Sequence, residues 1–339
     1  MSSSAGASGG RRKTGKGPDG TRREFLKKAV ALPAALVVAQ QAGEIAGVAK
    51  VEAAQADAPK AEPKLPQIRL GKHSISRLVC GANTFNGGSH LSVFVNHEMR
   101  RYFTPEQILK TLRRCEAEGI TCWQSGLGNL DLYRKHVEAG GKMHYIAIDA
   151  DVRAIQKLAA GGCIALAHHG EVTDNLFKGG QLDKVGDYLK RIRDAGLLAG
   201  VSTHMPDVVD AVESKGWDVD YYMTCVYERH RSEQALKKLL GHVPIPQGEV
   251  YLKEDPPRMY KAVRATKRPC LAFKIMAAGR LSERREWVEG AFRQAFESIK
   301  PTDGVIVGFY DRYDDQVGDN AALVRRFGGR KSAKAVAKG

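Results

Sequence analysis

Residues able to transfer protons or bind metal ions follow a series of short apolar runs, at the point where each run ends. They are Gln124, Asp149, His168, His169, Thr203, His204, Tyr227, Glu228 and Lys274. Imidazole, carboxylate and amine groups are the usual acids, bases and ligands of enzyme sites. Because side chains alternate between the two faces of a strand, only one of the adjacent His168 and His169 is expected to face a shared pocket. The set favours an enzyme over a domain that only binds a partner.

Four of these residues supply the donor atoms of a divalent-metal site. Asp149, His169, His204 and Glu228 offer two carboxylates and two imidazoles from four successive runs. Zinc accepts such donors at about 2.0–2.2 Å and, in catalytic sites, keeps one position open for water or substrate. Such a site requires the donor atoms to lie within about 5 Å of a common centre. The alternatives are that Asp149 and His204 each cap a following helix and that Glu228 lies in a solvated loop.

Lys274 lies inside the apolar segment CLAFKIM, residues 270–276. A lysine in such surroundings is rarely left without a partner, because burying an unpaired charge is unfavourable. Two interpretations follow: an internal ion pair with Glu228 or Asp149, or a catalytic amine.

The elements that must position these residues are strands and helices in alternation. Short runs rich in Val, Ile, Leu and Cys occupy residues 76–82, 119–124, 143–149, 163–169, 196–204, 219–227, 270–276 and 304–309. Most are separated by helical patterns with charged faces, such as the one that Thr104 is expected to cap before Pro105. Eight apolar strands alternating with helices over about 260 residues predict a single (β/α)8 TIM barrel. An open doubly wound sheet is the alternative, but no Gly-x-Gly-x-x-Gly turn follows the first run.

The long, Pro-rich interval after the sixth run, residues 228–259, predicts an inserted helix and loop over the barrel mouth. Ahead of the barrel, residues 59–66 are rich in Pro and Ala and predict a linker. The barrel itself is assigned to residues 67–327, and residues 328–339 to a basic, disordered tail.

The N-terminal segment, residues 1–58, has the order of elements of an export signal. Arg22 and Arg23 precede Phe25 and Leu26, an apolar run of residues 29–39 follows, and small residues after it offer cleavage positions. That run is too short to cross a bilayer, which takes about 20 apolar residues. The segment resembles a twin-arginine signal peptide, which implies recognition by the twin-arginine export machinery and export of the folded protein. The expected location is periplasmic or otherwise extracytoplasmic, with no transmembrane helix in the mature chain.

The net charge of +15 does not indicate a nucleic-acid-binding protein, because the charge lies at the two ends. Residues 1–28 hold eight Lys or Arg against two acids and residues 325–339 hold six with no acid, which leaves +3 between them. Five of the six cysteines lie in or beside strand-like runs without a Cys-x-x-Cys pair, so we expect buried, reduced thiols.

Several local patterns resemble the aldo-keto reductase family over nearly the whole mature chain. The segments LGKHSISRLVCGANTF, EAEGITCWQSG, LAHHG, GVSTH, FKIMAAGRLS and VIVGFYDRYDDQVGDN are similar to the family's entry hairpin, its strand-end catalytic segments and its nucleotide-binding loops. The resemblance implies NADP(H) as cofactor, with Ser202 and His204 near the nicotinamide. It also implies nucleotide contacts from residues 308–320, including Gly308 and Asn320.

The chain departs from the family at three of the four catalytic positions. Gln124 stands at the family's aspartate, Asp149 stands at its lysine, and the first available tyrosine is the displaced Tyr133. The histidine is matched by His169, which directly precedes Gly170. In the family, lysine and aspartate lower the pKa of the tyrosine that protonates the carbonyl oxygen, and Asp149 would have the opposite effect.

Three functional hypotheses remain open from the sequence. The first is an exported oxidoreductase that acts on a small carbonyl or hydroxylated substrate, sugars included, with NADP(H). The second is a metal-dependent lyase, isomerase or hydrolase for carbohydrate-like substrates. The third is a barrel that binds a ligand without catalysis.

Overall fold

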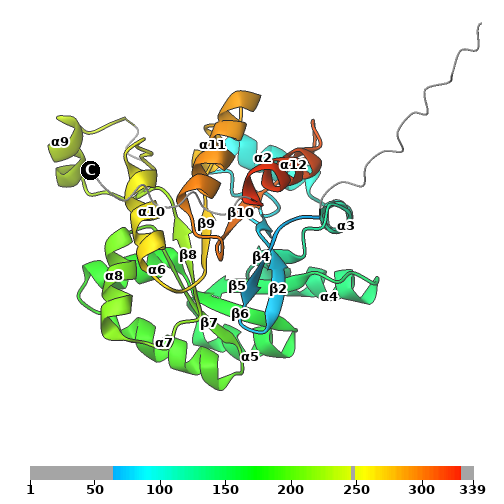
Figure 1. Ribbon diagram of the computed structural model, residues 1–339, viewed down its shortest axis with the longest axis horizontal. Helices are drawn as coiled ribbons and strands as arrows, with labels where there is room; N and C mark the ends of the chain where they lie inside the picture. Colours follow the sequence, from blue (N-terminus) through cyan, green and yellow to red (C-terminus); the bar gives the residue numbers. More distant parts are fainter. Residues whose placement is uncertain (1–63, 246–248, 330–339) are drawn as a thin grey trace, which may run out of the picture. The chain divides into compact units, whose positions relative to one another are not determined.

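The computed structural model describes residues 64–245 and 249–329. Their centre is a closed barrel of eight strands, in the order β10-β3-β4-β5-β6-β7-β8-β9, with every neighbouring pair parallel (Figure 1). The strands are β3 (Leu78–Gly81), β4 (Cys122–Ser125), β5 (His144–Asp149), β6 (Cys163–His168), β7 (Leu198–Thr203), β8 (Tyr221–Cys225), β9 (Cys270–Phe273) and β10 (Gly304–Gly308). Each of the eight apolar runs contains one of these strands to within one residue, so the predicted (β/α)8 TIM barrel is confirmed.

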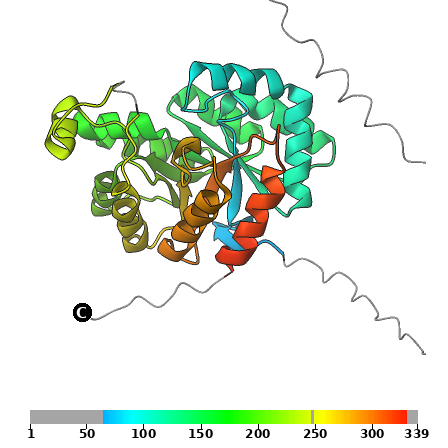
Figure 2. The same cartoon turned by 90° about the horizontal axis from the view of Figure 1, so that it is seen from above.

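Helices surround the barrel on its outer side (Figure 2). They are α2 (Val93–Tyr102), α3 (Pro105–Ala117), α4 (Leu130–Glu138), α5 (Val152–Ala160), α6 (Gly170–Lys178), α7 (Asp183–Asp194), α8 (Pro206–Lys215), α9 (Glu233–Leu240), α10 (Asp255–Ala265), α11 (Arg285–Ser298) and α12 (Gln316–Gly328), with 3₁₀ turns η1 (Leu127–Asn129) and η2 (Ala277–Gly279). Thr104 begins α3 as predicted, because its hydroxyl accepts a hydrogen bond from Gln107 N at 3.3 Å and Pro105 occupies the first turn.

The strands are apolar on both faces because two separate layers of side chains pack against them. The barrel interior is filled by Val79, Cys122, Ile146, Ala165, Ala167, Tyr221, Met223, Leu271 and Ile306. A larger layer lies between the strands and the helices and includes Trp123, Tyr145, Tyr222 and Phe292. A strand residue in the interior layer therefore points its side chain into the barrel, and a strand residue in the outer layer points its side chain towards the helices.

An antiparallel hairpin of β1 (Gln67–Leu70) and β2 (His73–Ser76) closes the amino end of the barrel. Its Ile68, Leu70 and Ile75 belong to the interior layer. The packed region begins before the predicted boundary at residue 67, since Leu65 is only 4% exposed. With the amino end filled, the carboxyl ends of the strands form the open end, where barrel enzymes hold their sites.

Gly200 on β7 lets the large ring of Tyr221 lie inside the barrel. A Cβ atom at position 200 would stand 2.4 Å from Cε1 of Tyr221, which is closer than van der Waals contact allows. We therefore expect any larger residue at position 200 to displace that ring.

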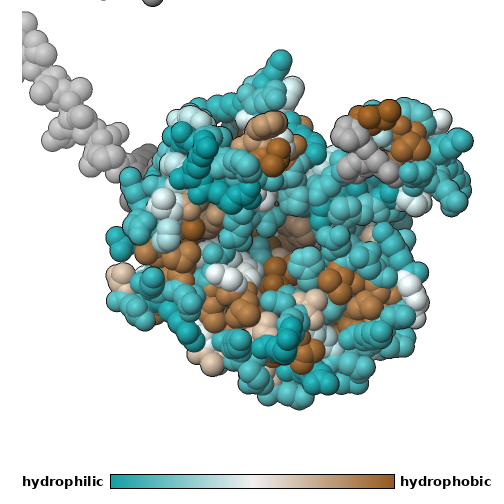
Figure 3. All heavy atoms as spheres, turned by 180° about the vertical axis from the view of Figure 1, so that it is seen from behind, coloured by the Kyte–Doolittle hydropathy of each residue, from teal (hydrophilic) through white to brown (hydrophobic). Residues whose placement is uncertain are grey.

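The segment between β8 and β9 carries an additional helix, α9, as predicted for residues 228–259. Its Glu249 binds Arg229 and also reaches the loop after β3, where His90 Nδ1 lies 2.8 Å from Glu249 Oε1. Figure 3 shows apolar surface beside the grey atoms at the projecting part of the molecule. In the inserted segment, the side chains of Leu239 and Ile245 are 59% and 98% exposed.

All six cysteines are buried and unpaired, which confirms the expectation of reduced thiols. Among residues 64–245 and 249–329, no helix has both the length and the apolar character to span a membrane. The predicted signal peptide, most of the predicted linker and residues 330–339 of the predicted tail lie outside the described residues. The tail was predicted to begin at residue 328, but Gly328 is buried at the end of α12.

Candidate active site

The two adjacent histidines at the end of β6 point to opposite sides of the barrel wall. Ala167 belongs to the interior layer, and His168 faces outwards, with Nδ1 2.7 Å from Thr173 Oγ1 on α6. The backbone N–H of His169 donates to Asp149 O at 2.9 Å, which continues the β5–β6 ladder by one residue. Alternation along that ladder places His169 on the inner side.

Gln124 on β4 also faces the interior, since it lies two residues after the interior Cys122. Its amide nitrogen donates to Ser125 O at 3.0 Å. An amide cannot act as an acid or a base near neutral pH, so Gln124 can contribute a polar contact but no proton transfer.

His204, directly after β7, forms a buried pair with Asp174 of α6. Nδ1 of His204 lies 2.7 Å from Asp174 Oδ2, and the two side chains are 6% and 7% exposed. The backbone N–H of His204 donates to the same carboxylate at 3.1 Å, and the Thr203 hydroxyl donates to its other oxygen. Because a carboxylate only accepts hydrogen bonds, the Nδ1 proton is on the imidazole, and Nε2 carries the lone pair.

The charge state of His204 follows from its surroundings. Burial lowers the pKa of His204 below its ordinary value; the Asp174 carboxylate opposes this, and the charges of Arg229 and Lys274 act with burial. The imidazole is therefore neutral at pH 7, with Nε2 available to accept a proton.

The sequence did not single out Asp174. One signal was present: Gly170, Thr173 and Asp174 share the face of α6 that packs on the barrel, and all three are buried. An acid on the buried face of an amphipathic helix needs a partner, because an unpaired buried charge is unfavourable. That partner could not be identified without the position of His204.

Lys274 lies directly after β9, and its amine makes no hydrogen bond or ion pair within residues 64–245 and 249–329. The side chain is only partly exposed, and burial lowers the pKa of its amine to about 8, with the charges of Arg229 and Arg280 acting in the same direction. The predicted ion pair with Glu228 or Asp149 is absent from the described part of the chain. Lys274 is therefore a half-buried amine without a carboxylate.

The turn after β9 is strained. Lys274, Ala277 and Ala278 have φ values of 58°, 49° and 52°, in the left-handed region that favours glycine. Each such residue costs on the order of 1 kcal/mol and persists only where the surrounding structure holds it, most often at functional sites. The strained turn positions both Lys274 and Arg280.

Two arginines lie near Lys274: Arg229 from the segment after β8 and Arg280 from the same turn. Arg280 stacks on the Tyr251 ring at 4.1 Å and has no carboxylate within 4 Å in the described residues, whereas Arg229 shares Glu249 with His90. Burial, followed by the charges of Lys274, Arg229 and Arg280, lowers the pKa of His90 to about 3. Within the described ranges, the positive charge of Lys274 and Arg280 is left without a counterion, which suits an anionic ligand.

Asp149 does not face the mouth, contrary to the sequence-based expectation. It follows the partly buried Ile148, which packs on the interior layer, so its own side chain points outwards. Its Oδ1 accepts hydrogen bonds from the backbone N–H groups of Ala150 and Asp151 at 2.8 and 2.9 Å. The Asp149 carboxylate therefore stabilises the start of the loop before α5. The predictions that Asp149 is catalytic and that it binds a metal ion are wrong.

Glu228 is neutralised by two arginines: Arg231, whose side chain is buried, and Arg258 of α10. Its Oε2 lies 2.7 Å from Arg258 Nη1 and 3.3 Å from Arg231 Nη2. Across residues 64–245 and 249–329, no group of three or more His, Cys, Asp or Glu is arranged to hold a metal ion. The predicted cluster of Asp149, His169, His204 and Glu228 does not form, because two of its four members are engaged elsewhere.

Tyr133 lies away from the open end of the barrel. It belongs to α4, and its ring stacks on Tyr145 with 4.6 Å between centroids. A Cβ atom on Gly162, just before β6, would stand 3.6 Å from Cε1 of Tyr133, so the ring lies near the amino end of that strand. Its predicted catalytic role is corrected, since it cannot reach a substrate at the opposite end.

The residues expected to bind NADP(H) are largely enclosed. Ser202 faces the interior beside His204, is 0% exposed, and its hydroxyl has no hydrogen-bond partner in the described residues. Asn320 on α12 is 5% exposed, and Gly308 ends β10 against Thr84. Ser202 therefore lies beside Gly170 and His204, whereas Gly308 and Asn320 belong to β10 and α12.

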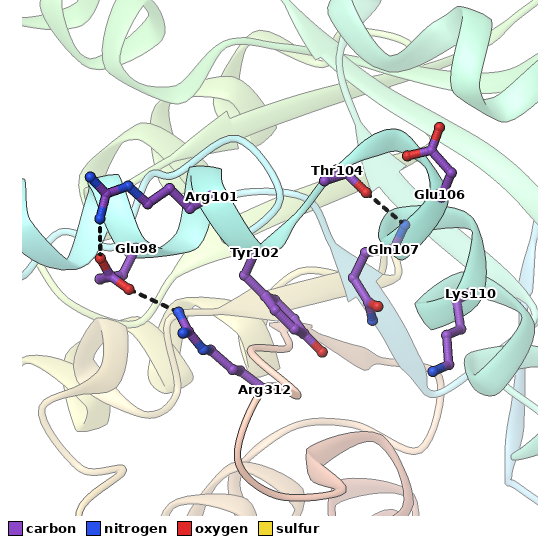
Figure 4. Close-up of a pocket in the computed structure, with 8 residues that line it drawn as sticks. All are labelled: Glu98, Arg101, Tyr102, Thr104, Glu106, Gln107, Lys110 and Arg312. Atoms are coloured by element: carbon purple, nitrogen blue, oxygen red, sulfur yellow. Dashed lines mark hydrogen bonds and ion pairs between the residues drawn. The ribbon is translucent and has the colours of Figure 1, made fainter.

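A separate cleft borders the segment after β10 (Figure 4). It has a volume of about 540 Å³ and is lined by Glu98, Arg101, Tyr102, Thr104, Glu106, Gln107, Lys110 and Arg312. Glu98 bridges Arg101 at 3.1 Å and Arg312 at 2.8 Å, and Tyr102 projects between Arg312 and Gln107. The cleft combines three cationic side chains with one exposed aromatic face.

The sequence matches no protein-family model, and no curated protein matches it. Among solved structures, it is similar to the glycerol dehydrogenase AKR11B4 from Gluconobacter oxydans, with a TM-score of 0.47, 12% identity, and coverage of 79% of this chain and 91% of that chain. A truncated 3-deoxy-D-arabino-heptulosonate 7-phosphate synthase from Thermotoga maritima gives a TM-score of 0.45, 12% identity, and coverage of 79% and 92%. Dihydropteroate synthase from Xanthomonas albilineans gives 0.41, 13% identity, and coverage of 76% and 96%. These similarities define no family for the chain.

Proposed function

We propose that this chain is an enzyme that transfers protons on a small anionic compound carrying a carbonyl or hydroxyl group, at the open end of the barrel. One observation supports the proposal above all others. The buried His204–Asp174 pair lies near the amine of Lys274, and Lys274 lies near Arg280; neither of these two cations has a counterion in the described residues.

The Asp174 carboxylate fixes both the tautomer and the orientation of the imidazole. Nε2 is then the proton acceptor, and it can remove a proton from a hydroxyl group or from the carbon next to a carbonyl. A positioned base of this kind contributes about 10²–10⁴-fold to a rate. His204 returns the same proton to another atom of the substrate, which is the chemistry of isomerases and lyases.

The cations act on the charge that this proton transfer creates. Removing a proton beside a carbonyl places negative charge on the oxygen, and fixed positive groups in a half-buried site stabilise that oxygen more strongly than water does. Lys274 and Arg280 lie in one strained turn, so their positions are set before a substrate arrives.

Exchange of carbon-bound protons with solvent deuterium tests the proposal. Pyruvate and dihydroxyacetone phosphate, two small anionic carbonyl compounds, are incubated with the folded protein in D₂O and followed by proton NMR. We expect exchange that falls by about 10²-fold or more in His204→Ala. His168→Gln, in which the outward histidine is changed, serves as the matched control and retains the exchange rate. Binding of either compound without exchange would instead support the non-catalytic barrel.

Oxidoreduction with NADP(H) is a second candidate, favoured by the cleft of Figure 4. The cleft borders residues 308–320, where nucleotide contacts are expected. Arg101, Lys110 and Arg312 would contact phosphate groups, and Tyr102 would stack on a base. The cofactor would supply hydride to a carbonyl carbon.

Titration with NADPH, followed by quenching of tryptophan fluorescence, tests the second candidate. We expect saturable quenching that weakens in Arg312→Ala but not in Lys267→Ala at the opposite end of the barrel. Absence of quenching at millimolar NADPH would reject this candidate and leave proton transfer in place.

Export by the twin-arginine route is a further proposal and depends on the N-terminal sequence alone. Changing both Arg22 and Arg23 to lysine should retain the folded, unprocessed protein in the cytoplasm. Continued export of that variant would show that these residues are not the recognition pair.

A further inference from the structure

The amine of Lys274 has no structural partner to explain its position. Lysines that stabilise a fold pair with carboxylates or extend into solvent, and Lys274 does neither in the described part of the chain. Glu228, the nearest predicted partner in sequence, binds Arg231 and Arg258 instead. A half-buried, unpaired amine is unfavourable for stability, so its presence calls for a chemical role.

The surroundings raise the fraction of free amine at Lys274 above that of an ordinary lysine. Burial lowers the pKa of Lys274 to about 8, and Arg229 and Arg280 add to this effect by repulsion. About a tenth of the amine is then uncharged at pH 7, compared with well under a hundredth for an ordinary lysine. Only the uncharged amine has the lone pair that attacks a carbonyl carbon.

The neighbours of Lys274 provide the two other functions that such an attack requires. Arg280, six residues along the same turn, has no carboxylate within ion-pair range in the described residues and can bind an anionic group of the substrate. His204 packs against Phe273, the residue before Lys274, with 5.7 Å between ring centroids. A proton acceptor, an amine and an anion-binding group thus follow β7 and β9, the two strands on either side of β8.

We infer that Lys274 captures the carbonyl carbon of the substrate as a covalent iminium, while Arg280 binds the carboxylate or phosphate of the same molecule. This inference rests on the proposed function, because it assigns the substrate class of the same site. The substrate is a small ketone or aldehyde with one anionic group, such as a 2-oxo acid or a phosphorylated ketose.

The chemical step balances without an oxidant or a reductant. The nitrogen lone pair forms the C–N bond, and the electron pair of the C=O bond moves to oxygen, which takes a proton from the solvent. The nitrogen gives up one proton to Nε2 of His204, which passes it to the hydroxyl group, and the oxygen leaves as water. The resulting positively charged iminium withdraws electrons, so His204 can then remove a proton from the adjacent carbon to give a neutral enamine.

Reductive trapping tests this inference directly. The full-length protein is incubated with pyruvate or with dihydroxyacetone phosphate, sodium borohydride is added, and intact mass and peptide mapping locate the secondary amine. We expect a single adduct on the peptide that contains Lys274, formed with one or both probes. The probe that gives the adduct identifies the anionic group as carboxylate or phosphate.

Variants separate capture by Lys274 from general reactivity of lysines. Trapping should fall at least tenfold in Lys274→Arg and in Lys274→Met, and should be unchanged in Lys267→Arg, an exposed lysine at the opposite end of β9. Arg280→Met should weaken trapping of the anionic probes but not that of uncharged dihydroxyacetone. The yield should rise with pH through about 8, as the amine loses its proton.

Two results would overturn the inference. One is an adduct that maps to other lysines or persists in both Lys274 variants; mapping in the unaltered protein decides this even if a variant fails to fold. The other is deuterium exchange by the unaltered protein, lost in His204→Ala, with no trapped adduct at Lys274. That second result would leave the proposed proton transfer intact and reject only the covalent role, whereas absence of both exchange and trapping would reject both.

Discussion

Both ends of the barrel hold charged side chains, but those at the amino end have hydrogen-bonded partners and two at the open end have no carboxylate partner in the described residues. At the amino end, Asp303 accepts hydrogen bonds from the backbone of Cys270 and Lys300 at 2.9 and 2.7 Å and pairs with the Lys300 amine at 3.0 Å. Arg77 donates to three backbone carbonyl groups there, among them Asp303 O at 2.7 Å. At the open end, the amine of Lys274 has no partner in the described residues, and Arg280 has no carboxylate.

The difference separates groups that hold the barrel together from groups available for chemistry. A buried charge whose hydrogen bonds are all made stabilises one arrangement of the chain, and its removal leaves partners unsatisfied. A half-buried charge without a counterion destabilises the empty protein and gains its partner only when a ligand binds. Substitutions at the two ends test this contrast.

The largest expected effect is on catalysis at the open end. Asp174→Asn should reduce deuterium exchange by about 10²–10⁴-fold, because an amide no longer selects the Nδ1-protonated tautomer of His204. The measurement is proton NMR with pyruvate or dihydroxyacetone phosphate. Asp149→Asn, which changes the outward carboxylate at the end of β5, is the control and should retain the exchange rate. Equal losses in the two variants would contradict the assignment of His204 as the base.

The next effect is on stability at the amino end. Asp303→Ala should lower the free energy of unfolding by about 3–5 kcal/mol, because it leaves two backbone N–H groups without their acceptor and Lys300 without its carboxylate partner. Urea unfolding followed by circular dichroism measures the change. Any soluble fraction should retain the site at the opposite end, so exchange per folded molecule should be preserved. A loss below about 1 kcal/mol would show that this network does not hold the barrel closed.

A smaller effect concerns the pH dependence of stability. The folded protein holds the pKa of Lys274 at about 8, below that of an unfolded lysine near 10.4, so the unfolded chain binds more protons between these values. This group therefore makes the protein more stable as pH rises from about 8 to about 10. The contribution is on the order of 1–2 kcal/mol after allowance for solvent.

Comparison of the unaltered protein with Lys274→Met isolates this contribution from the tyrosines and cysteines that titrate in the same range. Urea unfolding at pH 7.5 and at pH 10 should show the variant to be the more stable at the lower pH and its advantage to shrink at the higher pH. A constant difference between the two proteins would mean that Lys274 keeps an ordinary pKa.

The smallest effect is expected where ion pairs are exposed. Glu98→Gln removes the bridge to Arg101 and Arg312 in the cleft of Figure 4, where the side chains of Glu98 and Arg101 are 44% and 77% exposed. Solvent screens such pairs, so the free energy of unfolding should change by less than about 0.5 kcal/mol. Thermal unfolding measures it, and a loss comparable to that of Asp303→Ala would show that pairing matters more than burial in this protein.

The architecture of the barrel could be predicted from the amino-acid sequence alone. The eight apolar runs, the helical patterns between them, the cap at Thr104 and the inserted helix after the sixth strand all appear in the structure as predicted. These features depend on local periodicity, turn residues and the length of apolar runs, which the chain carries in consecutive residues. The buried, unpaired state of the cysteines followed from the same runs.

Which strand-end residues share a site could be seen only in the folded barrel. In a barrel strand both faces are buried, one by the interior and one by the helices, so no alternation of polar and apolar residues tells inside from outside. Asp149 and His169 both end such runs, yet the first points outwards and the second inwards. No local pattern around either residue makes that distinction.

Side-chain pairs between elements far apart in the chain could likewise not be predicted from the sequence. Asp174 contacts His204 because α6 packs over the end of β7, although the two residues are 30 positions apart in the sequence. Glu228 likewise pairs with Arg258, which belongs to α10. The turn at Lys274 adopts a left-handed conformation that strand alternation does not describe. Such contacts depend on the packing of whole elements, and this packing determines which charges are neutralised and which remain free to bind a substrate.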